Sequence, residues 1–245
     1  MAINAIYDRI GTDYARRRQA DPRVARLIHA ALGTAQSVVN VGAGAGAYEP
    51  AGRALIAVEP SAAMIAQRPA GAAPALCARA EALPLANKCV DAALAVLTVH
   101  HWADKTAGMR ELRRVARGAI VLLTYDPAHR PWLTDYLPQL AALDAAQMPA
   151  MADYARWLGP VRISPVLVPH DCIDGFLYAY WRRPEAYLDP AVRAGSSSFW
   201  AIDGAEQGLA ALADDLRAGA WARRYASVAA EDSYDAGYRL VVAPG

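Results

Sequence analysis

The stretch SVVNVGAGAGAYEP, residues 37–50, places three glycines at alternate positions directly behind a short run of valines. A buried strand that runs into a glycine-rich turn is typical of a strand-loop-helix unit whose loop approaches a ligand. Glycine allows backbone conformations closed to other residues and lets a bound group come close to the main chain. The next apolar run, ALIAVE at 54–59, ends in Glu59, where a carboxylate commonly binds the hydroxyl pair of a ribose. Together the two features predict a nucleoside-binding site.

Alternating strands and helices extend outward from this stretch. The strands are almost continuously apolar, which is typical of a parallel sheet covered by helices on both faces. The sequence therefore predicts a doubly wound α/β core. We expect strands at 37–41, 54–59, 89–97 and 119–125, and helices from about Gly46, at 61–67 and at 105–116.

The remaining segments predict additions to this core. Residues 1–35 have a helical pattern of apolar positions, and the chain after Tyr125 is broken by prolines and rich in aromatic residues. We expect a strand at 161–169, an amphipathic helix at about 205–224 and a closing strand. We predict a single domain spanning 1–245, divided into an N-terminal helical cap at 1–35, a cofactor-binding core at 36–126, a lid and substrate region at 127–235 around the sixth strand, and a last strand at 236–245.

Composition limits the classes of partner. The 245 residues hold 25 Lys and Arg against 24 Asp and Glu, so no global field attracts nucleic acid or an anionic membrane. Cys77, Cys89 and Cys172 are too scattered to predict a metal site or a disulfide framework. The N-terminus reaches Asp8 and Arg9 without an apolar signal core, and no stretch of 18 residues is apolar and uncharged. We expect a cytoplasmic monomer or weak homodimer acting on a small molecule.

Two kinds of nucleoside ligand fit the glycine stretch. GAGAGA also satisfies the dinucleotide pattern Gly-x-Gly-x-x-Ala if Ala47 is the third small residue, which would indicate an NAD(P)-dependent oxidoreductase. The third glycine, Gly46, stands one position too early for that pattern. A protein that binds a nucleoside cofactor without catalysis is a further alternative.

Four motifs in order resemble one family. VVNVGAGAG, AVEPSAAMI, ARAEALPLANKCVDAAL and LTVHHW, within residues 36–126, are similar to the motifs of class I S-adenosylmethionine-dependent methyltransferases. The branch they resemble contains small-molecule enzymes similar to the ubiquinone-type methyltransferases. The resemblance implies a Rossmann-like, seven-stranded, mostly parallel sheet, with helical lid insertions after strands 5 and 6. It also implies S-adenosyl-L-methionine as cofactor, S-adenosyl-L-homocysteine as product, and methyl transfer to an N, O or C atom by in-line displacement.

The resemblance also implies cofactor contacts. Asn40 stands where the family usually has Asp, so we expect Asn40→Asp to tighten cofactor binding. Arg79 stands where the family often has Asp, which removes a carboxylate from the adenine side. The implied cofactor-binding residues are Tyr14, Asn40, Gly42, Ala43, Gly44, Glu59, Pro60, Met64, Ala80, Glu81 and Leu97.

Two histidines follow the fourth strand at the carboxyl end of the sheet, where open α/β folds bind their ligands. Histidine titrates near neutral pH, and His101 matches a position at which some related enzymes keep a catalytic histidine. We therefore predict His101, and secondarily His100, as a general base. Flat apolar side chains near the same edge favour an aromatic or heterocyclic acceptor. The predicted substrate-binding residues are Tyr7, Trp102, Tyr125, Trp132, His170, Asp171 and Trp181.

Overall fold

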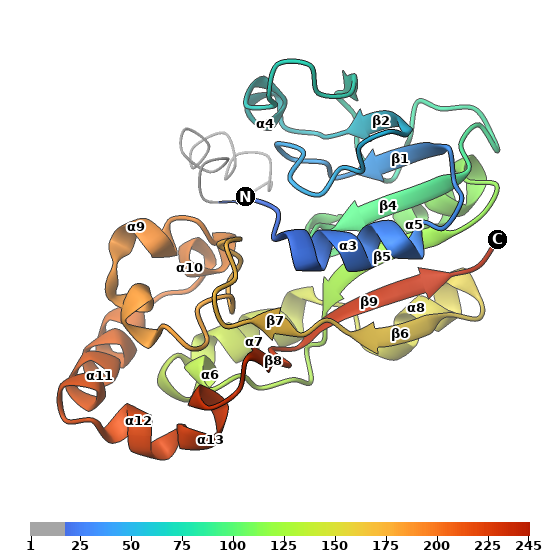
Figure 1. The fold of residues 1–245 in the computed structure, drawn as a ribbon. Coiled ribbons are helices and arrows are strands. Elements are labelled where there is room, and N and C mark those ends of the chain that lie inside the picture. Colours follow the sequence, from blue (N-terminus) through green and yellow to red (C-terminus); the bar gives the residue numbers. More distant parts are fainter. Residues whose placement is uncertain (1–17) are drawn as a thin grey trace.

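A seven-stranded sheet runs through the computed structural model, which describes residues 18–245 (Figure 1). Strands β1 to β5 pair in parallel, and β9 pairs antiparallel with both β5 and β6. This mostly parallel sheet confirms the predicted fold class. In spatial order the strands are β3 (Ala75–Leu76), β2 (Ala54–Val58), β1 (Ser37–Val41), β4 (Ala92–Val96), β5 (Ile120–Tyr125), β9 (Tyr238–Ala243) and β6 (Arg162–Pro165).

Helices lie on the sheet and beyond its edge. The helices of the core are α3 (Pro22–Ala31), α4 (Ala62–Ala66), the 3-10 turn Val99–His101 and α5 (Lys105–Val115). After β5 come α6 (Leu133–Tyr136), α7 (Pro138–Gln147) and α8 (Met151–Leu158). After the short strand β7 (Val168–Pro169) come the 3-10 helix Pro184–Leu188, α9 (Pro190–Arg193), α10 (Ser197–Ala201), α11 (Ala205–Arg217), α12 (Ala220–Arg224) and α13 (Ala226–Ala229), followed by β8 (Ser233–Tyr234), which pairs with β7.

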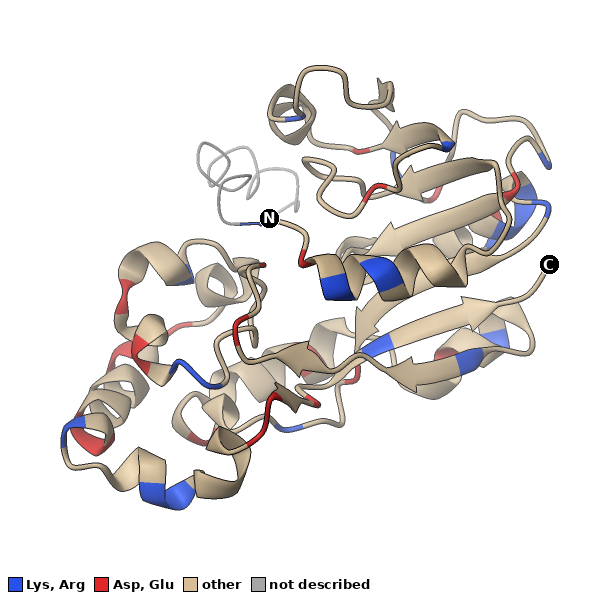
Figure 2. Ribbon diagram, in the orientation of Figure 1, with Lys and Arg blue, Asp and Glu red and all other residues tan. Residues whose placement is uncertain are grey.

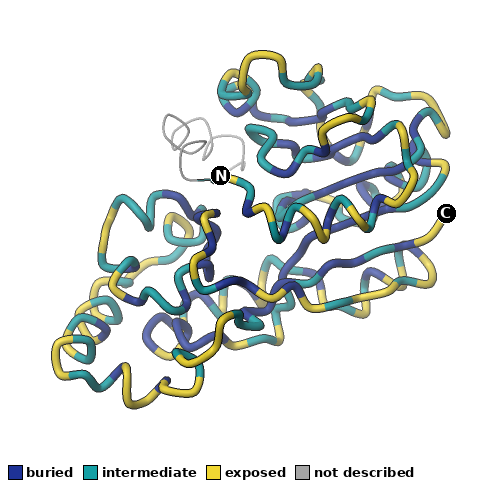
Figure 3. The backbone as a smooth tube through the Cα atoms, in the orientation of Figure 1, coloured by how far each residue is buried: buried dark blue, intermediate teal, exposed yellow. Residues whose placement is uncertain are grey.

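Side chains of the central strands enter two cores, one on each face of the sheet, because successive residues of a strand point to opposite faces. Val38 and Val121 pack in one core with Ile28 of α3, and the adjacent residues Val39 and Ile120 pack in the other. All six residues of β5 are buried. Figure 3 shows the strands as the buried centre of the molecule, with exposed backbone on the outer sides of the helices. This double burial explains why these strands are apolar throughout.

The lid comprises residues 131–148, which contain α6 and α7, and residues 170–229, which extend from the end of β7 to α13. It lies beyond the ends toward which β1, β2 and β4 point (Figure 1). Its interior is a cluster of buried aromatic side chains, with Trp132 contacting Tyr136, Tyr187, Trp221 and Tyr225. The lid therefore has an apolar core of its own next to the carboxyl edge of the sheet.

Several predicted elements have different bounds in the structure. The helix expected from Gly46 is absent, because Gly42, Gly44 and Gly46 have φ of 72°, 52° and 90° and residues 42–53 form turns. The expected helix at 205–224 is two helices, α11 and α12, separated by residues 218 and 219. The expected strand at 161–169 is divided between β6 and β7, which belong to different sheets. Of the N-terminal cap at 1–35, residues 1–17 lie outside the described part of the chain.

Charged residues of both signs are spread over the helices and loops of the core and the lid, whereas strands β1, β2, β4 and β5 contain none (Figure 2). Within residues 18–245, no helix is long and apolar enough to cross a membrane. The same part of the chain contains no group of three His, Cys, Asp or Glu side chains that could hold a metal ion.

A buried carboxylate joins α3 to the loop after β7. Asp21 is fully buried and accepts hydrogen bonds from the backbone N–H of Arg23, at 2.9 Å, and of Ile173, at 3.3 Å. Arg23 in turn pairs with Asp171 at 2.7 Å. Asp21 is thus both the N-cap of α3 and an anchor for the loop, because carboxylates satisfy the free N–H groups of a first helical turn.

The same loop is tied to the glycine-rich turn. Asp174, which is fully buried, pairs with Arg18 at 2.7 Å and accepts a hydrogen bond from Tyr48 Oη at 2.8 Å. Tyr48 directly follows the glycine stretch. These contacts hold the loop, the residues before α3 and the glycine-rich turn together.

We expect Asp21→Ala to lower the free energy of unfolding by about 2 kcal/mol, because the helix loses its cap and the Ile173 N–H loses its acceptor. Urea unfolding followed by circular dichroism measures the change. The control is Asp214→Ala, which removes an exposed ion pair with Arg217 and should cost no more than about 0.5 kcal/mol. An equal loss in the two variants would contradict the anchoring role of Asp21.

Candidate functional site

The glycine-rich turn packs against the end of β4. A Cβ atom at Gly42 would lie 2.0 Å from Thr98 Oγ1, so any side chain at this position would collide with Thr98. The backbone N–H groups of Gly42 and Ala43 both donate to the carbonyl of Val58, at 2.8 and 3.1 Å. The turn is therefore held between the ends of β2 and β4.

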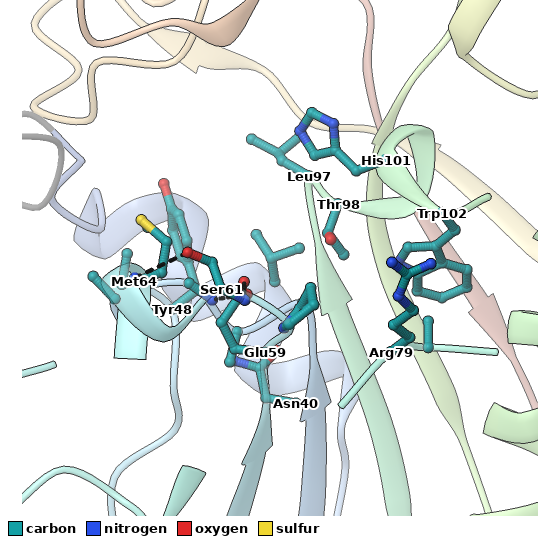
Figure 4. Close-up of a pocket in the computed structure, with 18 of the residues that line it drawn as sticks. Asn40, Tyr48, Glu59, Ser61, Met64, Arg79, Leu97, Thr98, His101 and Trp102 are labelled. Carbon is teal, nitrogen blue, oxygen red and sulfur yellow. Dashed lines mark hydrogen bonds between the residues drawn. The ribbon is translucent and has the colours of Figure 1, made fainter. Parts of the chain in front are cut away.

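Glu59, at the end of β2, connects this turn to α4 (Figure 4). Its carboxylate accepts hydrogen bonds from Gly44 N at 2.8 Å and from Ser61 N at 3.0 Å. The Ser61 hydroxyl caps α4 by accepting from Met64 N at 3.2 Å. Burial raises the pKa of Glu59, and the two backbone hydrogen bonds and the charge of Arg68 act in the opposite direction. These hydrogen bonds fix the orientation of the carboxylate.

A cavity of about 330 Å³ opens between these elements. In the view of Figure 4, Asn40 and Glu59 lie toward its lower end and His101 toward its upper end. Tyr14 lies outside the described residues. All the other predicted cofactor-binding residues line this cavity: Asn40, Gly42, Ala43, Gly44, Glu59, Pro60, Met64, Ala80, Glu81 and Leu97.

Asn40 provides a test of whether these residues fit the expected cofactor. Its Nδ2 donates to Glu49 Oε1 at 3.2 Å, and Glu49 pairs with Arg68 at 2.7 Å. Its Oδ1 is buried and accepts no hydrogen bond within the described part of the chain. Such an acceptor needs a donor, which the ammonium group of the methionine moiety would supply. Gly42 and Gly44 line the same cavity, where a bound group can approach the main chain, so the residues fit the cofactor.

The contact with Glu49 opposes the expectation that Asn40→Asp tightens binding. An aspartate at this position would place a second carboxylate against Glu49, and two like charges at this distance destabilise each other.

The cavity wall also contains residues that were not predicted as site residues, among them Arg18, Tyr48, Ser61 and Thr98. Thr98 lies in the LTVHHW motif, so its position directly after β4 could have indicated it. Arg18 ends a run of three arginines, and nothing in the local pattern distinguishes it from Arg16 or Arg17.

Leu97 has a left-handed backbone conformation, with φ of 50°. This conformation is costly for a residue with a branched side chain and is found most often at functional sites. Leu97 N donates to Leu123 O at 2.8 Å, which holds the residue at the end of β4. The strained residue turns the chain out of the sheet, so that the histidines that follow reach the cavity.

A second cavity of about 50 Å³ adjoins the first. Arg18, Leu97 and His101 line both cavities, and His100 lines the second. The opposite wall of the second cavity comes from β5, β9 and two parts of the lid, namely α7 and residues 176–198. Tyr125 of β5 is among its residues. Leu97 and His101 thus lie where the two cavities meet.

Both histidines are neutral at neutral pH. Burial, together with the positive charges of Lys105 and Arg18, lowers the pKa of His101 to about 4. Burial and the neighbouring His101 lower the pKa of His100 well below its usual range, and the two ring centroids lie 3.8 Å apart. The expectation of titration near neutral pH is therefore wrong for His101. A neutral imidazole can still accept a proton.

Some of the predicted substrate-binding residues line a cavity, and others are buried away from both cavities. Trp102 lines the first cavity and Tyr125 the second, but Trp132 and Trp181 are buried in the lid. Their ring N–H groups donate to the carbonyls of Trp181, at 2.8 Å, and Val168, at 2.9 Å. They stabilise the lid because each buried ring N–H has an acceptor there.

The predicted polar pair after the sixth strand also lies away from the cavities. Neither His170 nor Asp171 lines the first or the second cavity. Asp171 is exposed and pairs with Arg23, so it stabilises the contact of the loop with α3. Tyr7 lies outside the described residues.

Comparisons with known proteins agree with this geometry. Residues 39–122 match the model of a methyltransferase domain. A proposed methyltransferase from an antibiotic biosynthesis pathway of Anabaena variabilis ATCC 29413 is 36% identical, with a TM-score of 0.86 over 93% of this chain and 98% of that chain. No curated protein sequence matches the chain.

More distant structures share the fold. A methyltransferase from Thermotoga maritima, described as a possible histamine N-methyltransferase, is 20% identical, with a TM-score of 0.55 over 67% of this chain and 84% of that chain. Geranyl diphosphate C-methyltransferase from Streptomyces coelicolor A3(2) is 17% identical, with a TM-score of 0.50 over 90% of this chain and 77% of that chain. The choice left open by the glycine stretch is thus decided against a nicotinamide-dependent oxidoreductase and a non-catalytic binding protein. The chain belongs to the class I S-adenosylmethionine-dependent methyltransferases, and S-adenosylmethionine is its cofactor.

Proposed function

We propose that the protein methylates a small-molecule acceptor bound in the second cavity, on the side of the lid. The observation that carries this proposal is that the two cavities adjoin and share Leu97 and His101. When bound, S-adenosylmethionine would supply an electrophilic methyl group: the C–S bond would break as a nucleophile of the acceptor bonds in line to the methyl carbon, and S-adenosylhomocysteine would be the leaving group. Residues 127–235 act as the acceptor-binding part of a single methyltransferase domain.

The first cavity would hold the cofactor through groups of different chemistry. Glu59 accepts hydrogen bonds from the ribose hydroxyls, and Asn40 Oδ1 accepts a hydrogen bond from the ammonium group. Gly42, Ala43 and Gly44 lie along the methionine moiety. Arg18 lines the same cavity and, as a cation, suits the methionine carboxylate. Pro60 and Met64 flank the adenine, and Ala80 and Glu81 lie at its edge.

The acceptor would be aromatic or heterocyclic and small. Its nucleophilic atom lies close to Leu97 and His101. The His101 imidazole is uncharged at neutral pH, so it accepts the proton if the nucleophile must lose one. Tyr125 and its neighbours in the second cavity offer aromatic surface for a flat group. The relative from Anabaena variabilis supports a small-molecule acceptor, because antibiotic biosynthesis modifies small molecules.

We expect Glu59→Gln to weaken S-adenosylhomocysteine binding by roughly 10- to 100-fold, because the charge-assisted hydrogen bonds to the ribose are lost. Isothermal titration calorimetry measures the dissociation constant. Glu185→Gln, at an exposed position in the lid, is the control and should bind like the wild type. A folded Glu59→Gln variant whose dissociation constant stays within twofold of wild type would refute the ribose assignment.

Asn40→Asp should fail to tighten S-adenosylhomocysteine binding and should lower the free energy of unfolding by about 1–2 kcal/mol, because the new carboxylate faces Glu49. Calorimetry and urea unfolding on the same samples give both quantities. The matched control is Asn87→Asp, since Asn87 accepts a hydrogen bond from Arg114 and a carboxylate there should be tolerated. Tighter binding at unchanged stability would show that Glu49 does not oppose the substitution.

His101→Ala should leave S-adenosylhomocysteine affinity unchanged and lower turnover by about 10²- to 10⁴-fold if transfer requires proton removal. Because the neutral imidazole is the active form and its pKa is about 4, the wild-type rate should stay level down to about pH 5 and fall below it. Single-turnover kinetics across pH, with cofactor and acceptor at saturating concentration and His129→Ala as the control, measures both effects. Turnover of His101→Ala within twofold of wild type would remove His101 from the reaction.

A further inference from the structure

A buried carboxylate lines the second cavity. Asp144, on α7, is 4% exposed, and its Oδ2 accepts a hydrogen bond from Tyr178 Oη at 2.8 Å. No Lys, Arg or His side chain of residues 18–245 forms an ion pair with it. Burial raises the pKa of Asp144 to about 6, against the opposing effects of the Tyr178 hydrogen bond and of the Arg130 charge. At neutral pH the cavity therefore contains a carboxylate without a cationic partner.

Aromatic rings line the same cavity as this carboxylate. Tyr125, Phe176, Tyr178 and Tyr238 line the same cavity. The rings of Tyr125 and Tyr178 are stacked, with centroids 5.2 Å apart, and Tyr238 meets Tyr125 edge-on at 5.5 Å. Electron-rich faces of aromatic rings attract cations, and the attraction strengthens when water is excluded.

The other charges at the cavity do not cancel that of Asp144. Arg18 also lines the cavity, but it is paired with the buried Asp174. His100 and His101 are neutral at neutral pH because burial lowers the pKa of each. Arg130 acts on Asp144 through its charge but does not line the cavity, so among the described residues Asp144 is the lining charge without an ion-pair partner, which favours a cationic ligand over an anionic one.

We infer that the methyl acceptor carries a cationic nitrogen, a protonated amine or a quaternary ammonium, which Asp144 and the tyrosine rings of the same cavity bind. This inference rests on the proposal that the second cavity holds the acceptor. The bound nitrogen is not the methylated atom, because a protonated or quaternary nitrogen has no lone pair to attack a methyl group. The nucleophile is a second group of the same molecule, directed toward Leu97 and His101.

Calorimetry with two matched probes tests this inference. The full-length protein is saturated with S-adenosylhomocysteine and titrated with 2-phenylethylamine and with 2-phenylethanol, which share the aromatic skeleton and differ in charge. We expect the amine to bind at least tenfold more tightly than the alcohol, and Asp144→Asn to abolish this preference. The matched control is Asp215→Asn. Asp215 also accepts from a tyrosine hydroxyl, Tyr136 Oη at 2.6 Å, but lines neither cavity, so this variant should keep the preference.

The wild-type protein provides a second readout that does not depend on the folding of a variant. Between pH 7.5 and 5 the amine preference should decline as Asp144 binds a proton, with its pKa near 6 in the free cavity. The amine and Arg18 stay charged over this range, and the pKa values of Tyr125, Tyr178 and Tyr238 are raised by burial, so these groups stay neutral. The pKa of His101 is about 4, so His101 also stays neutral between pH 7.5 and 5.

Three results would overturn the inference: equal binding of amine and alcohol, binding of neither probe, or an amine preference retained in folded Asp144→Asn. These failures differ from failure of the proposed function. Methylation of an uncharged small molecule by the protein would contradict the inference but would agree with the proposed function. Tight amine binding in a protein that methylates no small molecule would contradict the proposed function.

Discussion

The site depends on one close contact, between the backbone of Gly42 and the side chain of Thr98. No Cβ fits at Gly42, so the turn after β1 can lie directly against the end of β4. This contact brings the glycine-rich turn next to Leu97, whose left-handed backbone leads the chain out of the sheet toward His101. A cofactor bound along the turn is thereby placed beside the residues that separate the two cavities.

The lid supplies most of the residues that line the second cavity, which the parallel strands of the sheet do not provide. The tryptophans Trp132 and Trp181 stabilise its interior, whereas Asp144 and Tyr178 face the second cavity from α7 and from the segment after β7. Asp174 ties that segment to Arg18 and Tyr48. The segment after β7, which lines the second cavity, is thus linked by buried charges to residues of the first cavity, and these contacts resist separation because an unpaired buried charge is costly.

The sequence predicted the parts that depend on local pattern. The apolar runs at 37–41 and 119–125 are central strands, and the predicted cofactor residues of the described chain, Glu59 among them, line one cavity. The expectation of a helix from Gly46 was wrong because three glycines at alternate positions, all with positive φ, form turns there. Long-range features were not predictable: nothing near Asp144 or Arg18 in the sequence shows that the folded chain buries them beside residues far away. The roles of Trp132 and Trp181 depended on packing of the lid in the same way.

The central claim is that this methyltransferase acts on a small molecule. The most direct test is to incubate the protein with S-adenosylmethionine carrying an isotopically labelled methyl group and a cell extract of its source. Small molecules are then separated from protein and nucleic acid, and labelled products are identified by mass spectrometry. We expect label in a small molecule carrying an aromatic or heterocyclic ring. Label confined to protein or nucleic acid, or its absence from every small molecule while the cofactor binds, would contradict it.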